Sequence, residues 1–242
     1  MKKLIVIVII MLVIFFCLNA NEKTRSQNES DAVKKTARDY IENWFDADAA
    51  GLDRVLHKEF AKRSVFPDEK TNEEFFLNQK KEDLIKGAQN YRGNIVPKNK
   101  RKISIDVFFV YGDMASACIE TATFIEYLHL ARTNSEWKII NSIYAPRQNK
   151  RKTSPVNPTI YHDLIGIYEF PQGFRVTVST ENRRLFLKVD GQPHFEVLPE
   201  SKNRYFLKSA IAQVEFIRDS SNNVIEMITY QPAGSLTGKK IE

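Results

Sequence analysis

Cysteine is scarce in this chain, which holds only two cysteines in 242 residues. Cys17 lies in an apolar N-terminal run that we expect to be removed, and Cys118 would then be the only thiol. A single thiol cannot form an internal disulfide. Because Cys118 lies in the strand-like run MASACIETATF with no nucleophile motif beside it, we predict a small buried side chain rather than a reactive one.

Sequence motifs of several catalytic classes are also missing. The chain has no G-x-S-x-G nucleophile elbow and no glycine-rich phosphate loop. Its four histidines form no H-x-H or HExxH pattern, and its two cysteines are far apart. A transition-metal site needs closely spaced ligands of these types. We therefore predict neither a metal ion nor an organic cofactor.

The formal net charge of +6 is unevenly distributed along the chain. Residues 1–30 contribute +2 and residues 148–160 contribute +3, whereas residues 31–147 contribute +1 and residues 161–242 contribute zero. The basic excess therefore lies in the N-terminal segment and in a linker, not on a folded face. Nucleic-acid binding relies on such a face, so we do not expect it here.

The first 20 residues have the pattern of an export signal. Lys2 and Lys3 precede the apolar run LIVIVIIMLVIFFCL, which is short for a membrane-spanning helix of roughly 20 residues. Ala20 is a suitable small residue at the cleavage point, and the polar residues 21–30 are typical of a tether. We expect an exported protein, periplasmic or secreted, without membrane contact once the signal is cleaved.

Two alternatives to a cleaved signal remain. Cys17 would carry a lipid in a bacterial lipoprotein, although Phe15 and Phe16 stand where such signals have small residues. The apolar run would otherwise stay uncleaved and act as an anchor. In each case the rest of the chain is exported.

Residues 31–146 change from helical to strand-like patterning. Apolar residues recur at helical spacing in residues 31–45, again from Leu52 through Leu56 to Phe60, and in the segment KKEDLIKGAQNY. Three strand-like runs follow, which are KISIDVFFVY, MASACIETATFIEYLHLA and EWKIINSIY. The middle run is very long for one strand, so it must bend or bulge, and a bent strand can curl a sheet around helices.

Prolines mark the clearest domain boundary. The segment PRQNKRKTSPVNP has three prolines and no apolar periodicity, so we place a linker at residues 147–160. Seven short strand-like runs, from IGIYEF to VIEMITYQ, fill residues 161–242 and predict an antiparallel sandwich or a small barrel. The predicted class is α+β, with a curved antiparallel sheet wrapped on three helices in residues 31–146 and a small all-β domain after the linker.

Three segments carry a resemblance to a known family: YIENWFDADAAGLDRVLHKEFAKRSV, DLIKG and GDMASACIETATFIEYLHLARTNSEWKIINSIY. With them, residues 31–145 resemble the cone-shaped nuclear-transport-factor-2-like superfamily, and within it the bacterial group labelled putative lumazine-binding. The resemblance implies helices on the concave face of a curved sheet and a ligand pocket at the open end of the cone. The superfamily includes isomerases, dehydratases, cyclases and proteins of no known activity, so the fold alone does not give the function.

Four later segments carry a second resemblance: LIGIYEF, LFLKVDGQP, LPESKNRYF and VEFIRD. With them, residues 161–242 resemble the small β domain that often follows β-lactamase-related serine hydrolase domains. That family offers no catalytic motif to carry over to these residues.

Glu126 is the candidate catalytic residue. It shares a strand face with Phe124 and Leu128 unless a bulge intervenes. A carboxylate among apolar side chains has a raised pKa, which suits a general base. The resemblance implies an aromatic hydroxyl or another polar partner in the pocket. The candidates for this partner are Tyr40, His57 and Tyr91.

Glu126 also has a structural interpretation as half of a buried ion pair, because an unpaired buried charge is too costly to leave alone. Arg63 is the candidate partner, at the place where the family has an arginine after its second helix. Such an arginine would equally hold an anionic ligand. Asn141 is a further candidate for the pocket, whereas His129 alternates with Glu126 onto the opposite sheet face.

We favour a non-catalytic role in which the cone binds a small molecule, aromatic or anionic, or the protein makes contacts through its sheet. The outer sheet face makes a homodimer plausible. One alternative is a cofactor-free isomerase or dehydratase that uses Glu126 as its base. The other is a structural or cell-envelope interaction module in which the β domain contacts the partner.

Overall fold

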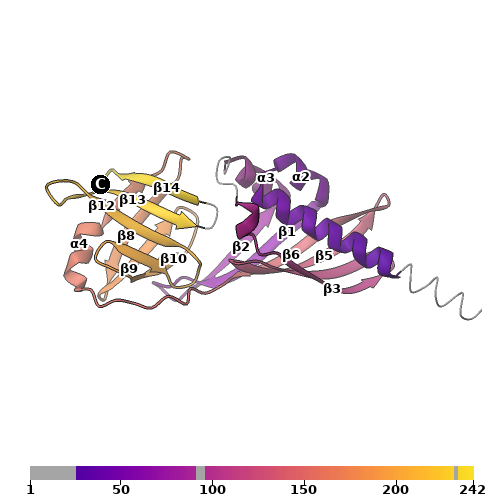
Figure 1. Cartoon of the computed structure of the whole chain (residues 1–242), viewed down its shortest axis with the longest axis horizontal. Coiled ribbons are helices and arrows are strands. Elements are labelled where there is room, and N and C mark those ends of the chain that lie inside the picture. Colours follow the sequence, from indigo (N-terminus) through magenta and orange to yellow (C-terminus); the bar gives the residue numbers. More distant parts are fainter. Residues whose placement is uncertain (1–25, 91–95, 232–233) are drawn as a thin grey trace, which may run out of the picture.

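A computed structural model describes residues 26–90, 96–231 and 234–242, and Figure 1 shows two domains side by side. The predicted signal peptide, the alternative lipid site at Cys17 and the candidate Tyr91 lie outside the described residues. Within these ranges no helix is both long and apolar enough to cross a lipid bilayer.

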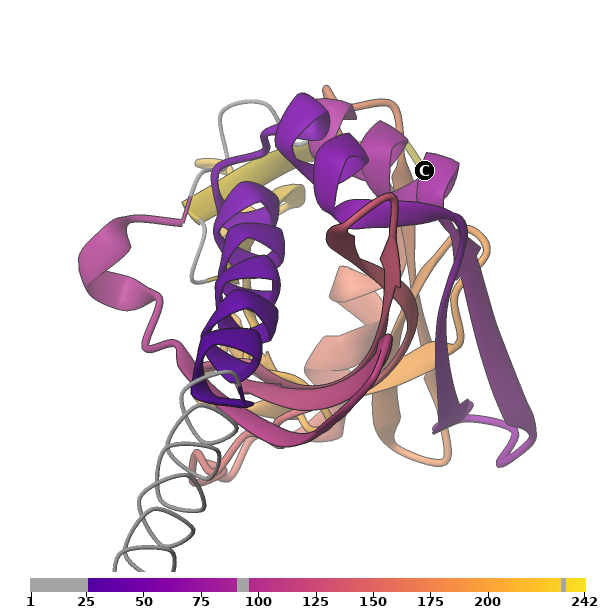
Figure 2. The same ribbon diagram turned by 90° about the vertical axis from the view of Figure 1, so that its right-hand side faces the viewer.

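The N-terminal domain is a curved sheet wrapped around a long helix over residues 26–45 (Figure 2). The sheet has six strands in the order β2-β1-β6-β5-β4-β3. β1 and β6 pair in parallel and the other neighbours pair antiparallel, so the sheet is mixed rather than wholly antiparallel. The elements are α2 (Ala49–Val55), β1 (Leu56–Pro67), β2 (Glu74–Lys80), α3 (Lys81–Asn90), η1 (Lys98–Lys100), β3 (Ser104–Tyr111), β4 (Met114–Glu120), β5 (Phe124–Thr133) and β6 (Glu136–Pro146).

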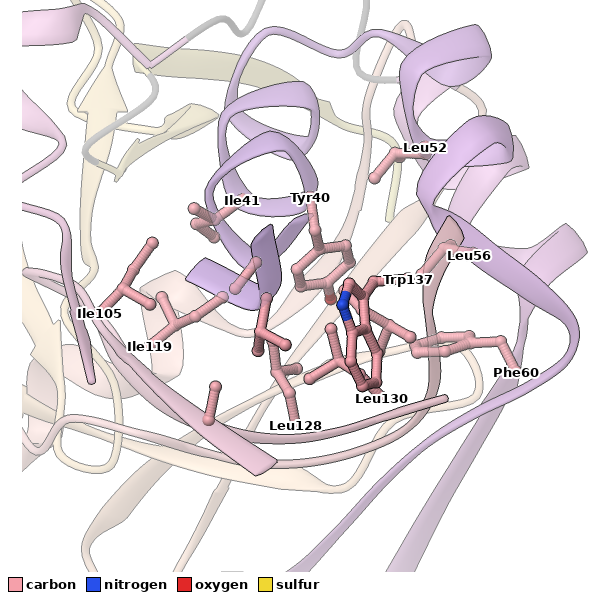
Figure 3. Packing of buried hydrophobic residues seen from close by; sticks show 14 of the residues in the cluster. Tyr40, Ile41, Leu52, Leu56, Phe60, Ile105, Ile119, Leu128, Leu130 and Trp137 are labelled. Carbon is pink, nitrogen blue, oxygen red and sulfur yellow. The ribbon is translucent and has the colours of Figure 1, made fainter. Parts of the chain in front are cut away.

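The long helix lies inside the curve of the sheet because its apolar residues share one face. Val33, Ala37, Tyr40 and Ile41 are buried in a single core cluster with the inward residues of the sheet. In Figure 3, side chains from both sides fill the space between helix and sheet. The labelled members of this core are Tyr40, Ile41, Leu52, Leu56, Phe60, Ile105, Ile119, Leu128, Leu130 and Trp137.

The second predicted helix is shorter than the sequence pattern indicates. α2 begins after Asp48, whose carboxylate accepts a hydrogen bond from the Gly51 backbone N–H at 2.9 Å, and it ends at Val55. Leu56 and Phe60 belong to β1 and are both buried there. A spacing of four residues fits one face of a strand as well as one face of a helix, so the apolar pattern alone could not separate the two.

The long run MASACIETATFIEYLHLA is a hairpin rather than one bent strand. β4 and β5 pair antiparallel with Glu120 opposite Ile125. The hydroxyl of Thr121 accepts hydrogen bonds from the backbone N–H groups of Thr123, at 3.2 Å, and Phe124, at 3.0 Å. This side-chain turn replaces the glycine or proline that usually marks a chain reversal, so the reversal is hard to see in the sequence.

The C-terminal domain is a closed antiparallel barrel with the strand order β10-β11-β12-β13-β14-β7-β8-β9. The strand that closes it, β14, was not predicted because GSLTGKK has few apolar residues. The α+β class with a following all-β domain is confirmed. The elements are η2 (Pro158–Ile160), α4 (Tyr161–Leu164), β7 (Gly166–Glu169), β8 (Arg175–Glu181), β9 (Arg184–Val189), β10 (His194–Pro199), β11 (Arg204–Leu207), β12 (Gln213–Arg218), β13 (Val224–Gln231) and β14 (Gly234–Lys240).

The turn between β1 and β2 joins the two domains. Asp68 accepts hydrogen bonds from the backbone N–H of His194 at 2.9 Å, and its carboxylate lies 2.8 Å from the His194 Nδ1. The neighbouring Glu69 accepts from the backbone N–H of Glu196 at 2.5 Å, and its carbonyl accepts from Arg184 at 3.0 Å. The hairpin of the cone domain is therefore fastened to strands β9 and β10 of the barrel.

Candidate functional site

Glu126 lies at the polar centre of the cone and is 0% exposed. The hydroxyls of Tyr40 and Ser142 donate hydrogen bonds to its Oε1 at 2.9 Å and 2.6 Å. Lys62 Nζ donates to Oε2 at 2.9 Å and also to the Tyr40 hydroxyl at 3.3 Å. The carboxylate thus has one ammonium and two hydroxyl partners.

Strand alternation brings these groups together. Glu126, Leu128 and Leu130 alternate toward the inside along β5 and are buried. Lys62 on β1 pairs in register with Ser142 on β6, which places both on the inner face. The long helix supplies Tyr40 from the opposite side, as Figure 3 shows for its side chain.

Aromatic rings enclose the ammonium of Lys62. Its Nζ lies 4.4 Å from the ring centroid of Tyr144, 5.6 Å from that of Phe124 and 5.9 Å from that of Tyr40. Cation–π attraction adds to the ion pair at such distances. The Lys62 side chain is 12% exposed, so the charge pair is almost shut off from water.

The two phenols of the cluster are held in their neutral form. Burial, together with the nearby charge of Glu126, raises the pKa of Tyr144 to about 12. The same two causes, and the hydrogen bond to Glu126, raise the pKa of Tyr40 well above its usual value. Both tyrosines therefore keep their protons at physiological pH, and Tyr40 remains a hydrogen-bond donor to Glu126.

This geometry favours the ion-pair interpretation of Glu126, with a different partner from the predicted one. The partner is Lys62, whereas Arg63 points to the other face of β1 and is exposed. A general base needs a lone pair directed at a substrate proton. Here the carboxylate oxygens are occupied by Lys62, Tyr40 and Ser142.

Arg63 and Asn141 lie together on the outer face of the sheet, not in the cone. Arg63 Nη1 donates to Asn141 Oδ1 at 2.6 Å, and Asn141 Nδ2 lies 3.3 Å from His129 Nδ1. The prediction that Asn141 and Arg63 line the interior is corrected by this placement. His129 points outward on β5, as the sequence predicts, and lies beside Asn141 on this outer face.

His57 stands apart from both groups. It lies near the start of β1 rather than on a helix, and its Nδ1 accepts a hydrogen bond from the backbone N–H of Glu59 at 3.1 Å. Of the predicted residues, Tyr40 and Glu126 meet in the cone. Sequence reasoning missed Lys62, Ser142 and Tyr144, although each alternates with apolar residues on strands whose inner face is buried.

The junction of the two domains forms a groove of about 480 Å³. Its residues come from the ends of β5 and β6, from the linker and from the barrel turn before β12. They are Ile125, Ala145, Pro146, Arg147, Gln148, Lys150 and Ile211. Arg147 is held by Glu120, at 2.6 Å, and by the Thr121 carbonyl, at 2.9 Å. Lys150 is exposed and has no ion-pair partner among the described residues.

The described residues contain no cluster of histidine, cysteine and carboxylate side chains that would hold a metal ion. Cys118 is buried, as expected, and burial raises the pKa of its thiol. A buried thiol with a raised pKa is a poor nucleophile.

Comparison with known proteins matches each domain to a family. Residues 28–145 match the family described as "Putative lumazine-binding", and residues 150–241 match a family described as "Domain of unknown function (DUF3471)". A stretch of 70 residues is 36% identical to penicillin-binding protein 4* of Bacillus subtilis (strain 168). That stretch is 29% of this chain but only 16% of the relative, so the chain spans a small part of that protein.

Solved structures of NTF2-like proteins match about half of the chain. An NTF2-like protein of unknown function from Silicibacter pomeroyi DSS-3 is 15% identical, with a TM-score of 0.40, over 50% of this chain and 98% of that chain. One from Shewanella baltica OS155 is 21% identical, with a TM-score of 0.41, over 50% and 96%. One with a cystatin-like fold from Novosphingobium aromaticivorans is 13% identical, with a TM-score of 0.41, over 53% and 88%.

The chain contains one S-x-x-K sequence, the pattern of penicillin-recognising serine enzymes, at Ser135 to Lys138. Ser135 lies in the exposed turn between β5 and β6, whereas Lys138 lies on β6 and pairs with Glu136 at 2.6 Å. No buried nucleophile results from this arrangement. The two resemblances seen in the sequence are confirmed: residues 28–145 match the putative lumazine-binding family of nuclear-transport-factor-2-like proteins, and residues 150–241 match a separate family of C-terminal domains.

Proposed function

We propose that this protein binds a small amphipathic anion, without catalysis, in the groove between its two domains. The family description, "Putative lumazine-binding", supports a small-molecule ligand. We place the ligand at the domain junction and not in the cone, because the polar centre of the cone is occupied by the protein's own side chains.

The interior of the cone offers little for a ligand to bind. A ligand that needs Glu126 would have to displace Lys62 or a hydroxyl partner and leave a buried charge without compensation. Trp137, Leu130 and Phe60 pack in the space between helix and sheet, as Figure 3 shows. The same packing removes support for an isomerase or dehydratase that uses Glu126 as its base.

The groove at the domain junction has apolar walls and a lysine, which suit an amphipathic anion. Apolar side chains of the cone, Ile125 and Ala145, face Ile211 of the barrel across the junction. Lys150 at this site lacks an acidic partner among the described residues, so an anionic group gains a favourable contact there. The volume of about 480 Å³ lies within the range of small-molecule sites. The main observation behind the proposal is that apolar side chains from both domains line the groove next to an unpaired lysine.

Anilinonaphthalene sulfonate, an aromatic anion that fluoresces in apolar sites, tests the proposal by titration. We expect Ile211→Asp and Lys150→Glu each to weaken binding about tenfold, because each replaces a favourable contact with a carboxylate. The control is Ile225→Asp, which changes an exposed isoleucine on β13 outside the groove. An equal loss in the control, or unchanged binding in Ile211→Asp, would contradict the proposal.

We also propose that residues 1–20 direct export. The support is the sequence pattern alone, with Lys2 and Lys3 before an apolar run and Ala20 at its end. The mass of the protein isolated from its host tests this. A mature chain that begins at Asn21 is expected, whereas a lipidated Cys17 or an intact N-terminus would replace this proposal with one of its alternatives.

A second candidate function is self-association through the outer face of the sheet. Eight large apolar side chains are exposed on its strands: Val65, Phe76, Phe108, Phe109, Tyr111, Met114, Tyr127 and Ile143, here called the outer apolar face. At about 200 Å² for each side chain, the exposed parts add up to roughly 900 Å². Each partner in a stable interface buries roughly 800 Å², so we propose a second copy of this chain as the occupant.

A further inference from the structure

A second hollow, of about 220 Å³, lies between the long helix and the segment 98–103, which contains η1. It is formed by Arg38 and Glu42 of the helix and by Lys98, Arg101, Lys102 and Ile103. Four of the six lining residues are cationic, whereas one is acidic. None of these residues contributes to the groove at the domain junction.

Arg101 is the fixed member of this cluster. It is 5% exposed, and its Nε donates a hydrogen bond to the carbonyl of Val96 at 2.9 Å. Its guanidinium pairs with Asp46 and lies 5.8 Å from the ring centroid of Phe45. A buried arginine with these contacts keeps one orientation, and binding a ligand would cost it little conformational entropy.

The remaining cations have few acidic neighbours. Glu42, the one carboxylate in the lining, lies 3.5 Å from Arg38. The side-chain ammonium groups of Lys98 and Lys102 are exposed and have no hydrogen-bond or ion-pair partner in the described parts of the chain. The backbone of Lys102 has a φ of 44°, in the left-handed region that a residue with a Cβ seldom adopts. Local backbone strain of this kind often occurs where a side chain has a functional position.

We propose that this hollow binds a small oxyanion of the phosphate class, such as a phosphate monoester or pyrophosphate. The free ammonium groups of Lys98 and Lys102 supply charge-assisted hydrogen bonds to its oxygens, and the guanidinium groups of Arg101 and Arg38, paired with Asp46 and Glu42, line the same hollow. At roughly 30 Å³ for each water, the hollow holds about seven water molecules. This is room for a phosphate group and a few attached atoms.

Calorimetric titration of the purified protein with pyrophosphate at low ionic strength tests the proposal. The test variant is Lys98→Gln with Lys102→Gln, and the matched control removes the same charge from exposed lysines of the barrel, outside both hollows, through Lys202→Gln with Lys239→Gln. We expect about tenfold weaker binding in the first pair, as for the loss of two partly exposed ion pairs, and less than a twofold change in the second.

Several results would overturn the proposal. They are the absence of pyrophosphate binding at millimolar concentration, an equal weakening by both pairs of substitutions, or binding of citrate as tight as that of pyrophosphate. Absence of pyrophosphate binding would show that no such site exists. Equal weakening by both pairs would show only general attraction by net charge, and equally tight citrate binding would contradict the assignment to the phosphate class. The lysines are on the surface, so the variants are expected to fold, and unchanged circular dichroism checks this.

Discussion

Lys62 and Glu126 form the ion pair at the centre of the cone, with 2.9 Å between Nζ and Oε2 and three aromatic rings around the ammonium. Glu126 is 0% exposed and Lys62 is 12% exposed, so water cannot fully solvate either charge when its partner is removed. The pair joins β1 to β5, with β6 between them in the sheet, so its main effect is on the fold.

Lys62→Met should destabilise the protein strongly. The change leaves the Glu126 carboxylate buried without its cation, which typically costs about 3–5 kcal/mol. Urea unfolding measures the loss, and Lys58→Met at an exposed position of β1 is the control. Adding Glu126→Gln to Lys62→Met should recover part of the loss, because no charge is then left buried. A loss of less than about 1 kcal/mol in Lys62→Met would show that water reaches the carboxylate.

The raised pKa of Tyr144 predicts alkaline instability. In the unfolded chain a tyrosine loses its proton near pH 10, whereas folding holds the pKa of Tyr144 at about 12. The stabilisation is therefore complete below pH 10 and is lost as the pH rises from 10 to 12. Tyr144→Phe should reduce the fall of unfolding free energy over this range by about 2 kcal/mol. The control is Leu130→Val, a buried substitution in the same domain that removes no titrating group and should keep the original slope.

The turn that joins the domains should be sensitive to Asp68. Its carboxylate accepts from the backbone N–H groups of His194, at 2.9 Å, and of Lys70 and Thr71, both at 3.0 Å. Asp68→Ala removes these acceptors, and we expect faster proteolytic cleavage in the linker after Pro146 because the domains then separate more often. Glu73→Ala, an exposed carboxylate in the same turn, is the control. Equal cleavage rates in Asp68→Ala and the unchanged protein would argue against this role.

The outer apolar face predicts a dimer that a single charge can disrupt. Tyr127 and Ile143 are neighbours on β5 and β6 and are each 54% exposed. Ile143→Glu would place two carboxylates in an apolar interface, one from each copy, and should weaken association at least a hundredfold. Sedimentation equilibrium measures the change, with Ile225→Glu on the barrel as control. A monomer at all accessible concentrations of the unchanged protein would remove the proposal.

Much of the fold can be predicted from the spacing of apolar residues. The placement of polar residues depends on strand boundaries and bulges, which that spacing does not reveal. The resemblance to the cone-shaped superfamily implies a polar partner beside Glu126, with Tyr40 as one of three candidates, and the Tyr40 hydroxyl does contact Glu126. Lys62 is not predicted as the partner of Glu126 because Leu56 and Phe60 fit a helix as well as a strand, so the strand that begins at Leu56 cannot be recognised from the sequence. Reading residues 56–67 as a strand would have placed Lys62 on the same face as Phe60.

Asn141 shows how one extra residue changes a prediction. Trp137 and Ile139 point inward along β6, and strict alternation would carry Asn141 inward with them. The pairing of β5 with β6 shifts between His129 and Leu130, which leaves Ile140 as an extra residue. This bulge turns Asn141 outward and Ser142 inward, where Ser142 contacts Glu126. A bulge of this kind has no signature in the amino-acid sequence.

Native mass spectrometry of the protein purified gently from its host tests the central claim, that the ligand binds at the domain junction and not in the cone. We expect a bound mass of a few hundred daltons on the unchanged protein, its loss from Ile211→Asp and its retention by Tyr40→Phe, which removes one of the hydroxyl partners of Glu126. A bound mass that survives in Ile211→Asp but is lost from Tyr40→Phe would contradict binding at the junction and place the ligand in the cone.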